Sequence, residues 1–212
     1  MGPRQRARRK TLYRGQRVVT ARLRLGTHAA VLGVPPSAIA EQHTPLEDLW
    51  GDAAERLAQR LAGADDAARA ASILDEAIAE RLVTRAIEPH TRLVLEAAAR
   101  LPTVRVNEVA DALGVSERNL RRVFREVVGM SPKEFARLMR FHLALTEART
   151  GKDVDWAGVA AAAGYYDQAH LIAEFRDIAG VTPRALLSEL RGGAPARARA
   201  AETQSCARWT SA

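Results

Sequence analysis

Four arginines near the middle of the chain have the spacing of a single helix face. They follow the pattern i, i+3, i+4 and i+7, and they are Arg118, Arg121, Arg122 and Arg125. Residues at these spacings form one stripe along an α-helix. We expect the acidic neighbours Glu117 and Glu126 to lie off this stripe, which leaves four like charges that repel one another until an anion binds. The stripe therefore predicts an anion-binding surface rather than an ordinary solvated face.

Other reactive side chains are too sparse to predict a catalytic or metal site. The chain has one cysteine, Cys206, which can form neither an internal disulfide nor a thiolate cage. Four histidines lie too far apart for a metal site that is local in sequence: His28, His43, His90 and His142. We therefore expect no catalytic residue, no metal and no cofactor.

The composition is that of a folded protein with an uneven distribution of charge. The chain has 212 residues, of which 47% are hydrophobic, enough for one large domain or two small ones. Residues 1–24 contain nine basic and no acidic residues, residues 25–99 have a net charge of −6, and residues 100–191 have a net charge of +2. Because no run of about 18 apolar residues occurs, we expect a cytoplasmic protein that does not enter a membrane.

The order of Gly, Pro, apolar and charged residues divides the chain into parts. Residues 1–16 are rich in arginine and poor in large apolar side chains, which predicts a disordered basic leader. Residues 17–25 alternate apolar and polar side chains, which predicts a half-buried strand, but no partner strand is evident. From Pro89 to about Leu190 apolar residues recur with helical spacing. Residues 192–212 are rich in Ala, Gly and polar residues, which predicts a disordered tail.

The helical half contains an internal repeat. Four residues recur 51 positions later: Leu120, Phe124, Gly129 and Pro132 correspond to Leu171, Phe175, Gly180 and Pro183. Upstream the offset is 50, where Val109, Ala110 and Gly114 correspond to Val159, Ala160 and Gly164. The extra residue of the second copy falls in a turn, where insertions disturb a structure least.

Each copy of the repeat has the pattern of two helices joined by a tight turn. Gly114 and Gly164 supply the turn residue, since glycine readily adopts a positive φ. Ser116 and Asp167 follow as N-cap residues of the second helix. Two helices joined in this way form a helix-turn-helix, whose second helix fits the major groove of DNA. The arginine stripe is then a DNA-reading face.

At these residues the sequence resembles the AraC/XylS family of bacterial transcription regulators. The first family motif, S-x-R-x-L-x-R-x-F followed by G-x-S-P, is present as Ser116, Arg118, Leu120, Arg122, Phe124, Gly129, Ser131 and Pro132. The second motif, A-x-x-x-G-[FY] followed by F-[RK] and G-x-[ST]-P-x-x-[FYL], is present as Ala160, Gly164, Tyr165, Phe175, Arg176, Gly180, Thr182 and Pro183. The resemblance covers residues 89–191, about half of the chain.

The resemblance implies a mainly α fold in which residues 89–191 form a DNA-binding domain. Two helix-turn-helix units are joined by one long helix, for which residues 132–149 have the right apolar pattern. Residues 17–88 are then a remnant or part of an N-terminal sensor or dimerisation domain. This segment is expected to be short and α+β, because it contains the predicted strand but lacks the further strands with which such domains normally begin.

The second helix of each unit supplies the candidate DNA contacts. Base readers are expected to be Arg118, Arg121 and Arg122 in the first unit and Gln168, Ala169, His170 and Ala173 in the second, because arginine pairs with guanine and glutamine with adenine. Phosphate contacts, which position a protein without reading sequence, are expected from Ser116, Arg125, Lys133, Arg140, Tyr166, Arg176 and Arg184.

Ala173 departs from the family pattern. It stands 51 positions after Arg122, where family members usually carry arginine or lysine. An apolar side chain can touch a thymine methyl group but donates no hydrogen bond. Specificity is therefore expected to depend mainly on the first unit.

The expected function is that of a sequence-specific transcription regulator that binds double-stranded promoter DNA and reads two successive major-groove segments. A homodimer, contact with RNA polymerase and a small-molecule effector are further partners that the family implies. The alternative is a truncated or degenerate regulator that acts mainly through protein interaction and binds DNA weakly. An enzyme is not expected, because the family-linked alkyl-transfer repair activity needs a reactive cysteine in a folded setting, and Cys206 lies in the predicted tail.

Overall fold

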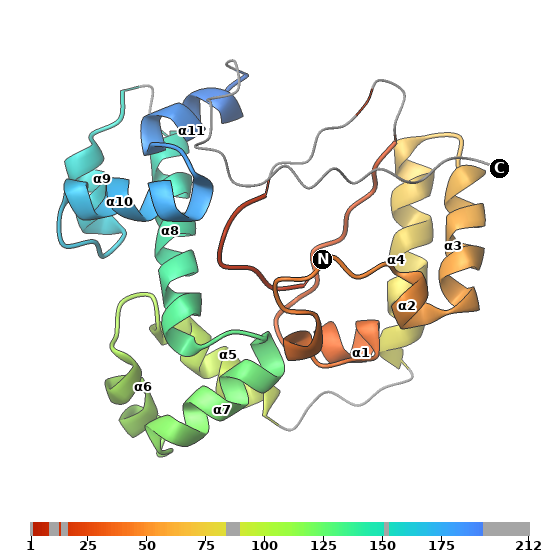
Figure 1. Cartoon of the computed structure of the whole chain (residues 1–212), viewed down its shortest axis with the longest axis horizontal. Helices are drawn as coiled ribbons and strands as arrows, with labels where there is room; N and C mark the ends of the chain where they lie inside the picture. The colour runs from red at the N-terminus through yellow and green to blue at the C-terminus, as the bar shows by residue number, and fades with distance from the viewer. Residues whose placement is uncertain (1, 9–12, 14–16, 84–89, 151–152, 193–212) are drawn as a thin grey trace. The chain divides into compact units, whose positions relative to one another are not determined.

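The computed structural model describes residues 2–8, 13, 17–83, 90–150 and 153–192. Every regular element in these ranges is helical (Figure 1). The elements are α1 (His28–Leu32), η1 (Pro36–Ile39), α2 (Glu47–Trp50), α3 (Asp52–Ala62), α4 (Ala67–Val83), α5 (Thr91–Arg100), α6 (Val106–Ala112), α7 (Glu117–Val128), α8 (Pro132–Thr150), α9 (Trp156–Ala162), α10 (Gln168–Ala179) and α11 (Pro183–Leu190). The mainly α fold expected from the sequence is confirmed. In the described ranges, no helix has the length and apolar character needed to span a bilayer.

The strand predicted for residues 17–25 is wrong. No strand occurs in the described part of the chain, and residues 17–25 have irregular backbone with mostly exposed side chains. The alternation of Val19 and Leu23 with polar residues produces a strand only where a neighbouring strand pairs with the backbone. Since none is present in the described ranges, the α+β assignment of the N-terminal segment is corrected to α.

Two compact units divide the described residues, and each has its own core. The first unit contains residues 2–5, 13 and 17–139, and the second contains residues 6–8 and 140–192, apart from the undescribed gaps. The boundary between Met139 and Arg140 falls inside α8. The N-terminal part of α8 therefore packs in the first unit and its C-terminal part in the second.

In the first unit, α5, α6 and α7 pack around a common core (Figure 1). The fully buried side chains include Leu101, Leu120 and Phe124. Burial of one such side chain contributes about 1.5–3 kcal/mol. Phe124 also lies edge to face with Phe135 of α8, with ring centroids 5.3 Å apart. These contacts hold α7 with one face buried, so that its opposite face is presented to solvent.

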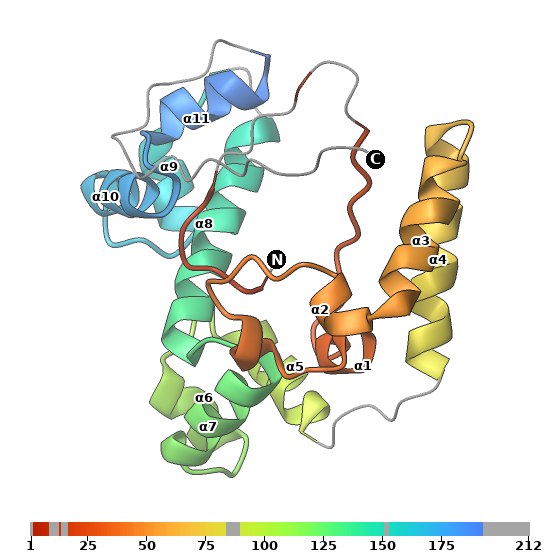
Figure 2. The same cartoon turned by 45° about the vertical axis from the view of Figure 1, so that its right-hand side comes forward.

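Helices α3 and α4 form a hairpin in the first unit, with a small core that includes Leu57 and Ile73 (Figures 1 and 2). The carbonyl of Val31, at the end of α1, accepts hydrogen bonds from the indole of Trp50 at 3.0 Å and from Nε of Arg81 at 2.7 Å. The Arg81 guanidinium lies over the Trp50 ring, 4.4 Å from its centroid. These contacts tie α1, α2 and α4 together.

The short helix η1 packs against the C-terminal end of α7. Pro36 and Ile39 of η1 are buried. Gly129 ends α7 with a φ of 81°, a left-handed conformation that glycine adopts without steric cost. A Cβ atom at this position would lie 2.9 Å from the carbonyl oxygen of Pro36. Gly129 therefore provides both the helix end and the space that η1 occupies.

Part of the predicted leader makes contacts in the first unit. The carbonyl of Pro3 accepts a hydrogen bond from the Glu41 N–H at 2.9 Å, and Nε2 of Gln5 donates to Glu134 Oε1 on α8 at 2.7 Å. The leader positions 1, 9–12 and 14–16 and the tail positions 193–212 lie outside the described residues.

In the second unit, α9, α10 and α11 surround a core that includes the fully buried Leu171 and Phe175. Phe175 of α10 lies against Phe141 of α8, with ring centroids 4.4 Å apart. Tyr165, in the turn before α10, is also buried. The exposed face of α10 is therefore opposite a well-packed apolar face, as it is for α7.

Candidate nucleic-acid interface

Two helix pairs of this protein have the same construction. In the first pair, α6–α7, and in the second, α9–α10, a helix of 7 residues is followed by a helix of 12. The connecting turn runs from residue 113 to 116 in the first pair and from residue 163 to 167 in the second. The extra residue of the second copy therefore lies in the turn, as the two offsets of the repeat predict.

Both turns close with the Schellman pattern that ends many helices. In the first pair, the Gly114 N–H donates to the Asp111 carbonyl at 3.1 Å and the Val115 N–H donates to the Ala110 carbonyl at 3.0 Å. In the second pair, the Gly164 N–H donates to the Ala161 carbonyl at 3.1 Å and the Tyr165 N–H donates to the Ala160 carbonyl at 2.9 Å. Gly114 and Gly164 have φ values of 67° and 76°, which other residues rarely adopt. The predicted role of both glycines is confirmed.

The N-caps that were predicted for the second helices are also confirmed. Ser116 Oγ accepts a hydrogen bond from the Asn119 N–H at 3.2 Å, and Asp167 Oδ1 accepts one from the His170 N–H at 2.7 Å. A cap of this kind stabilises a helix by about 1 kcal/mol. The start and direction of α7 and α10 are thus determined by local hydrogen bonds.

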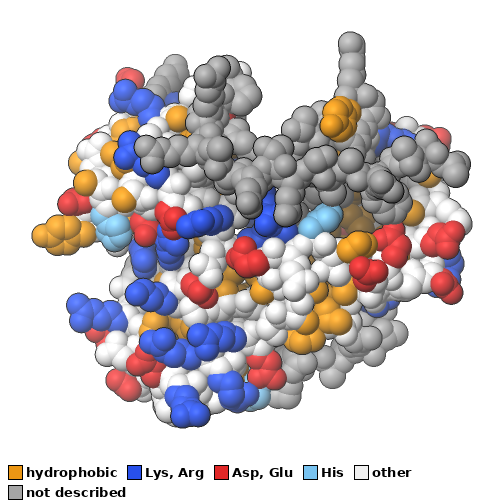
Figure 3. Space-filling model, viewed as in Figure 1, with side chains coloured by type: hydrophobic (Ala, Val, Ile, Leu, Met, Phe, Trp, Pro, Cys, Tyr) orange, Lys and Arg blue, Asp and Glu red, His pale blue; other side chains and the backbone are white. Residues whose placement is uncertain are grey.

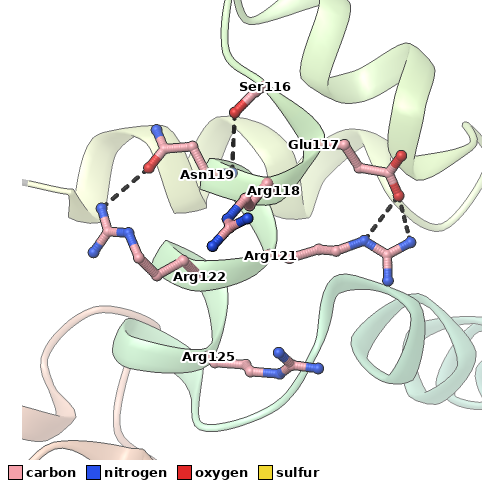
Figure 4. Close-up of a pocket in the computed structure, with 7 residues that line it drawn as sticks. All are labelled: Ser116, Glu117, Arg118, Asn119, Arg121, Arg122 and Arg125. Atoms are coloured by element: carbon pink, nitrogen blue, oxygen red, sulfur yellow. Dashed lines mark hydrogen bonds and ion pairs between the residues drawn. The ribbon is translucent and has the colours of Figure 1, made fainter.

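The arginine stripe lies on the exposed face of α7. Its four side chains are exposed, whereas Leu120, Val123 and Phe124 on the opposite face are fully buried. Basic side chains gather over the part of the first unit that contains α6 and α7, with acidic ones among them (Figure 3). A surface recess of about 760 Å³ is lined by Ser116, Glu117, Arg118, Asn119, Arg121, Arg122 and Arg125 (Figure 4).

The expectation that Glu117 and Glu126 lie off the stripe is wrong. Glu117 pairs with Arg121, whose Nε donates to Oε1 at 2.8 Å, and Glu126 pairs with Arg122, whose Nη1 donates to Oε2 at 3.0 Å. Each glutamate is four positions from its arginine, and such residues are neighbours on a helix surface. Two of the four charges are thus partly neutralised, whereas Arg118 and Arg125 form no ion pair within the described part of the chain.

Four of the phosphate candidates lie on or next to α7 and α8. Ser116 is the N-cap of α7, Arg125 lies on α7 and the exposed Lys133 is in the first turn of α8. Arg140, also on α8, is half-buried and belongs to the second unit. The start of α8 has a capping box, in which Ser131 N donates to Glu134 Oε2 at 2.6 Å and Glu134 N donates to Ser131 Oγ at 3.3 Å. The box holds the turn that carries Lys133 in one conformation.

The candidates of the second unit lie on one exposed side of α10 and next to it. Gln168, Ala169, His170, Ala173 and Arg176 are all exposed on α10, Tyr166 is 93% exposed in the preceding turn, and Arg184 is exposed in the first turn of α11. The His170 ring stands at 89° to that of the buried Tyr165, with centroids 5.4 Å apart. This side of α10 carries fewer hydrogen-bond donors than α7.

One polar residue of this surface, Asn119, is missing from the contacts expected from the sequence. Asn119 lies in the first turn of α7, lines the recess, and accepts a hydrogen bond at Oδ1 from Nη2 of Arg122 at 3.1 Å (Figure 4). The repeat contained a signal for it, because Asn119 is 51 positions before His170, a predicted base reader.

Two groups with lowered pKa values lie outside this interface. Burial lowers the pKa of His28 on α1, and a hydrogen bond with Ser72 is the main cause that lowers the pKa of Glu76 on α4. No three His, Cys, Asp or Glu side chains among the described residues gather where they could hold a metal ion.

One comparison with known proteins identifies this region. Residues 109–189, from α6 to α11, match the family model of a helix-turn-helix domain. No curated protein matches the chain, and no solved structure matches it. The matched family is the AraC type that the motifs of the sequence indicated. Residues 109–189 are therefore an AraC/XylS-type helix-turn-helix domain, and the protein that carries it is a DNA-binding transcription regulator.

Proposed function

We propose that this regulator binds DNA sequence-specifically and reads two successive major-groove segments, one with α7 and one with α10. The observation that carries the proposal is the repeated construction of the two helix pairs, with equal helix lengths and the same turn hydrogen bonds. In a helix-turn-helix the second helix enters the major groove. Both second helices here bury one face and expose the other.

The length of α8 supports this proposal. The helix has 19 residues, which at 1.5 Å per residue gives about 28 Å. Successive major-groove segments on one side of a duplex are about 34 Å apart. A helix of this length can connect two helix pairs that bind neighbouring segments of the major groove.

We assign the contacts by side-chain chemistry. Arg118, Arg121 and Arg122 of α7, with Gln168, Ala169, His170 and Ala173 of α10, read base edges. The residues that bind phosphate are Ser116, Arg125, Lys133, Arg140, Tyr166, Arg176 and Arg184. Arginine can donate two hydrogen bonds to guanine, whereas a lysine near the backbone acts as a point charge. The first helix pair, α6–α7, therefore supplies most of the specificity.

We also propose that residues 89–191 are the DNA-binding domain and that residues 17–88 are part of a sensor or dimerisation domain. The hairpin α3–α4 has its own small core, which supports a separate role for this segment. A homodimer, RNA polymerase and a small effector are the partners that this organisation would serve. A DNA partner agrees with the cytoplasmic location expected from the sequence.

The proposal is tested by the salt dependence of DNA binding. The purified full chain is used to select duplexes from a random pool, and dissociation constants for selected and random duplexes are measured at several salt concentrations. Arg122→Ala should weaken binding to selected duplexes about 5- to 150-fold, with a smaller effect on random ones. Lys133→Ala should weaken both equally and reduce the salt slope by about one unit.

Two results would contradict this function. If the chain selected no common motif, the regulator would act by another route, such as the protein interactions of a degenerate family member. If Arg122→Ala and Lys133→Ala behaved alike on selected and random duplexes, the division into base readers and phosphate contacts would be wrong.

A further inference from the structure

Asn119 stands where a recognition helix contacts base edges. It is the third residue of α7, and its backbone N–H is held by the N-cap hydroxyl of Ser116 at 3.2 Å. The N-terminal residues of a recognition helix are those that reach the bases in a helix-turn-helix. Its side chain lines the recess beside Arg118 and Arg122 (Figure 4).

The amide of Asn119 has a defined orientation. Nη2 of Arg122 donates to Asn119 Oδ1 at 3.1 Å, and Nη1 of the same guanidinium donates to Glu126 Oε2 at 3.0 Å. Arg122 is thus held from both sides along the helix. Because a guanidinium can only donate, its partner atom on Asn119 must be the carbonyl oxygen, and the NH₂ group points elsewhere. Within the described residues this NH₂ group has no hydrogen-bond partner.

The hydrogen bond between Asn119 and Arg122 is separate from the Glu117–Arg121 ion pair of this face. Figure 4 shows Asn119 and Arg122 on one flank of α7 and Glu117 and Arg121 on the other, with Arg118 between them. The four residues therefore form two pairs. Only the Asn119–Arg122 pair joins a charged donor to an amide that can both donate and accept.

We propose that Asn119 is a specificity-determining residue that reads adenine, with Arg122 as the residue that orients its amide. The proposal rests on the proposed function of α7 as a major-groove reader. Asparagine recognises adenine by donating to N7 and accepting from the N6 amino group. A carbonyl oxygen has two lone pairs, so Asn119 Oδ1 can accept from adenine while it keeps the hydrogen bond from Arg122. Arg122 is then set to contact a neighbouring base.

The internal repeat supports this assignment independently. Asn119 corresponds to His170 at the offset of 51. His170 occupies the same turn of α10, is exposed, and lies against the Tyr165 ring. Each second helix therefore has, at this position, a polar side chain with nitrogen groups for hydrogen bonding that lies against a neighbour.

The experiment is a selection of duplexes from a random pool by four full-length proteins. They are the wild type, Asn119→Ala, Asn119→Asp and the control Asn107→Ala, which removes the other asparagine of the chain, exposed on α6. The wild type should select adenine at one position that Asn119→Ala no longer prefers, with affinity for the selected duplex about 5- to 150-fold lower. Asn107→Ala should keep the wild-type motif.

Asn119→Asp separates base reading from a structural role. A carboxylate keeps an acceptor for Arg122 and is favourable in the first turn of a helix, so α7 should stay folded, as circular dichroism can verify. Because a carboxylate accepts from the amino group of cytosine, the preference at that position should change from adenine to cytosine. A residue that only stabilised α7 would change affinity without changing the base.

The outcomes distinguish this proposal from the function on which it rests. A wild type that selects no motif overturns both. If the wild type selects a motif, and Asn119→Ala and Asn119→Asp select the same motif at every position, the regulator function stands. The role of Asn119 as a base reader is then overturned.

Discussion

Gly129, at the end of α7, lies directly against Pro36 of η1. A Cβ atom on Gly129 would be 2.9 Å from the carbonyl oxygen and carbonyl carbon of Pro36, closer than Cβ atoms come to other heavy atoms in real proteins. The two residues are 93 positions apart, since 129 minus 36 is 93. The N-terminal segment therefore contributes to the packing of the helix that carries the arginine stripe.

We predict that Gly129→Ala destabilises the protein more than Gly114→Ala does. Both glycines have positive φ values, 81° and 67°, so both substitutions cost about 1–2 kcal/mol in backbone strain. A Cβ atom at Gly114 has open space around it, whereas one at Gly129 must displace η1, which adds about 1–3 kcal/mol. Urea unfolding of both variants measures the difference. Equal losses would mean that η1 does not pack on α7 in solution.

We predict that Glu126→Gln raises the affinity for random DNA. The substitution removes a carboxylate that pairs with Arg122 at 3.0 Å and that also repels phosphates. Exposed pairs of this kind contribute up to about 1 kcal/mol, so the increase should be about two- to fivefold at low salt and smaller at high salt. Fluorescence anisotropy with a random duplex measures it.

The matched control is Glu96→Gln on α5. Glu96 forms the same i,i+4 pair, with Arg92 at 3.0 Å, but it lies outside the arginine stripe. Its substitution should leave DNA affinity nearly unchanged. A similar gain from both variants would indicate an effect of net charge alone and not of the α7 surface.

We predict that Ala173→Arg strengthens DNA binding through α10. Ala173 is exposed on α10, at the repeat position of Arg122, and the buried residues of this helix are Leu171, Phe175 and Ile178. One added cation near the phosphates should make the salt slope steeper by about one unit. Ala99→Arg, the same substitution at an exposed position of α5, is the control. If both gave the same slope, α10 would not bind in a groove.

We predict that His28 makes folding sensitive to mild acid. Burial lowers the pKa of His28 in the folded protein. At pH values between the folded and unfolded pKa, His28 therefore binds a proton in the unfolded chain but not in the folded protein, which favours unfolding. Its contribution to stability is therefore complete above the ordinary histidine pKa of about 6.5 and is lost as the pH falls through the lower, folded value. His28→Leu should show a smaller fall in melting temperature between about pH 7.5 and pH 5. An identical fall in both proteins would exclude this role.

Local patterns in the sequence predicted the construction of the two helix pairs. Ser116 and Asp167 cap their helices, and Gly114 and Gly164 form the turns, because caps and turns depend on hydrogen bonds between residues a few positions apart. The exposure of the arginine stripe followed from helical periodicity for the same reason. The ion pairs of Glu117 and Glu126 with arginines of this stripe are equally local. The interpretation of the sequence missed them, although their i,i+4 spacing indicates them.

Contacts between distant parts of the chain were decided only by the tertiary structure. The alternation in residues 17–25 predicted a strand, but a strand needs a second strand to satisfy its backbone, and none lies in the described residues. The packing of Pro36 against Gly129 and the hydrogen bonds of Trp50 and Arg81 to the Val31 carbonyl have no local signature. The sequence by itself thus determined which residues face outward on α7 and α10, because periodicity sets that. The packing of η1 against the end of α7 depends on the close fit of two surfaces that are distant in sequence, so only the folded chain determines it.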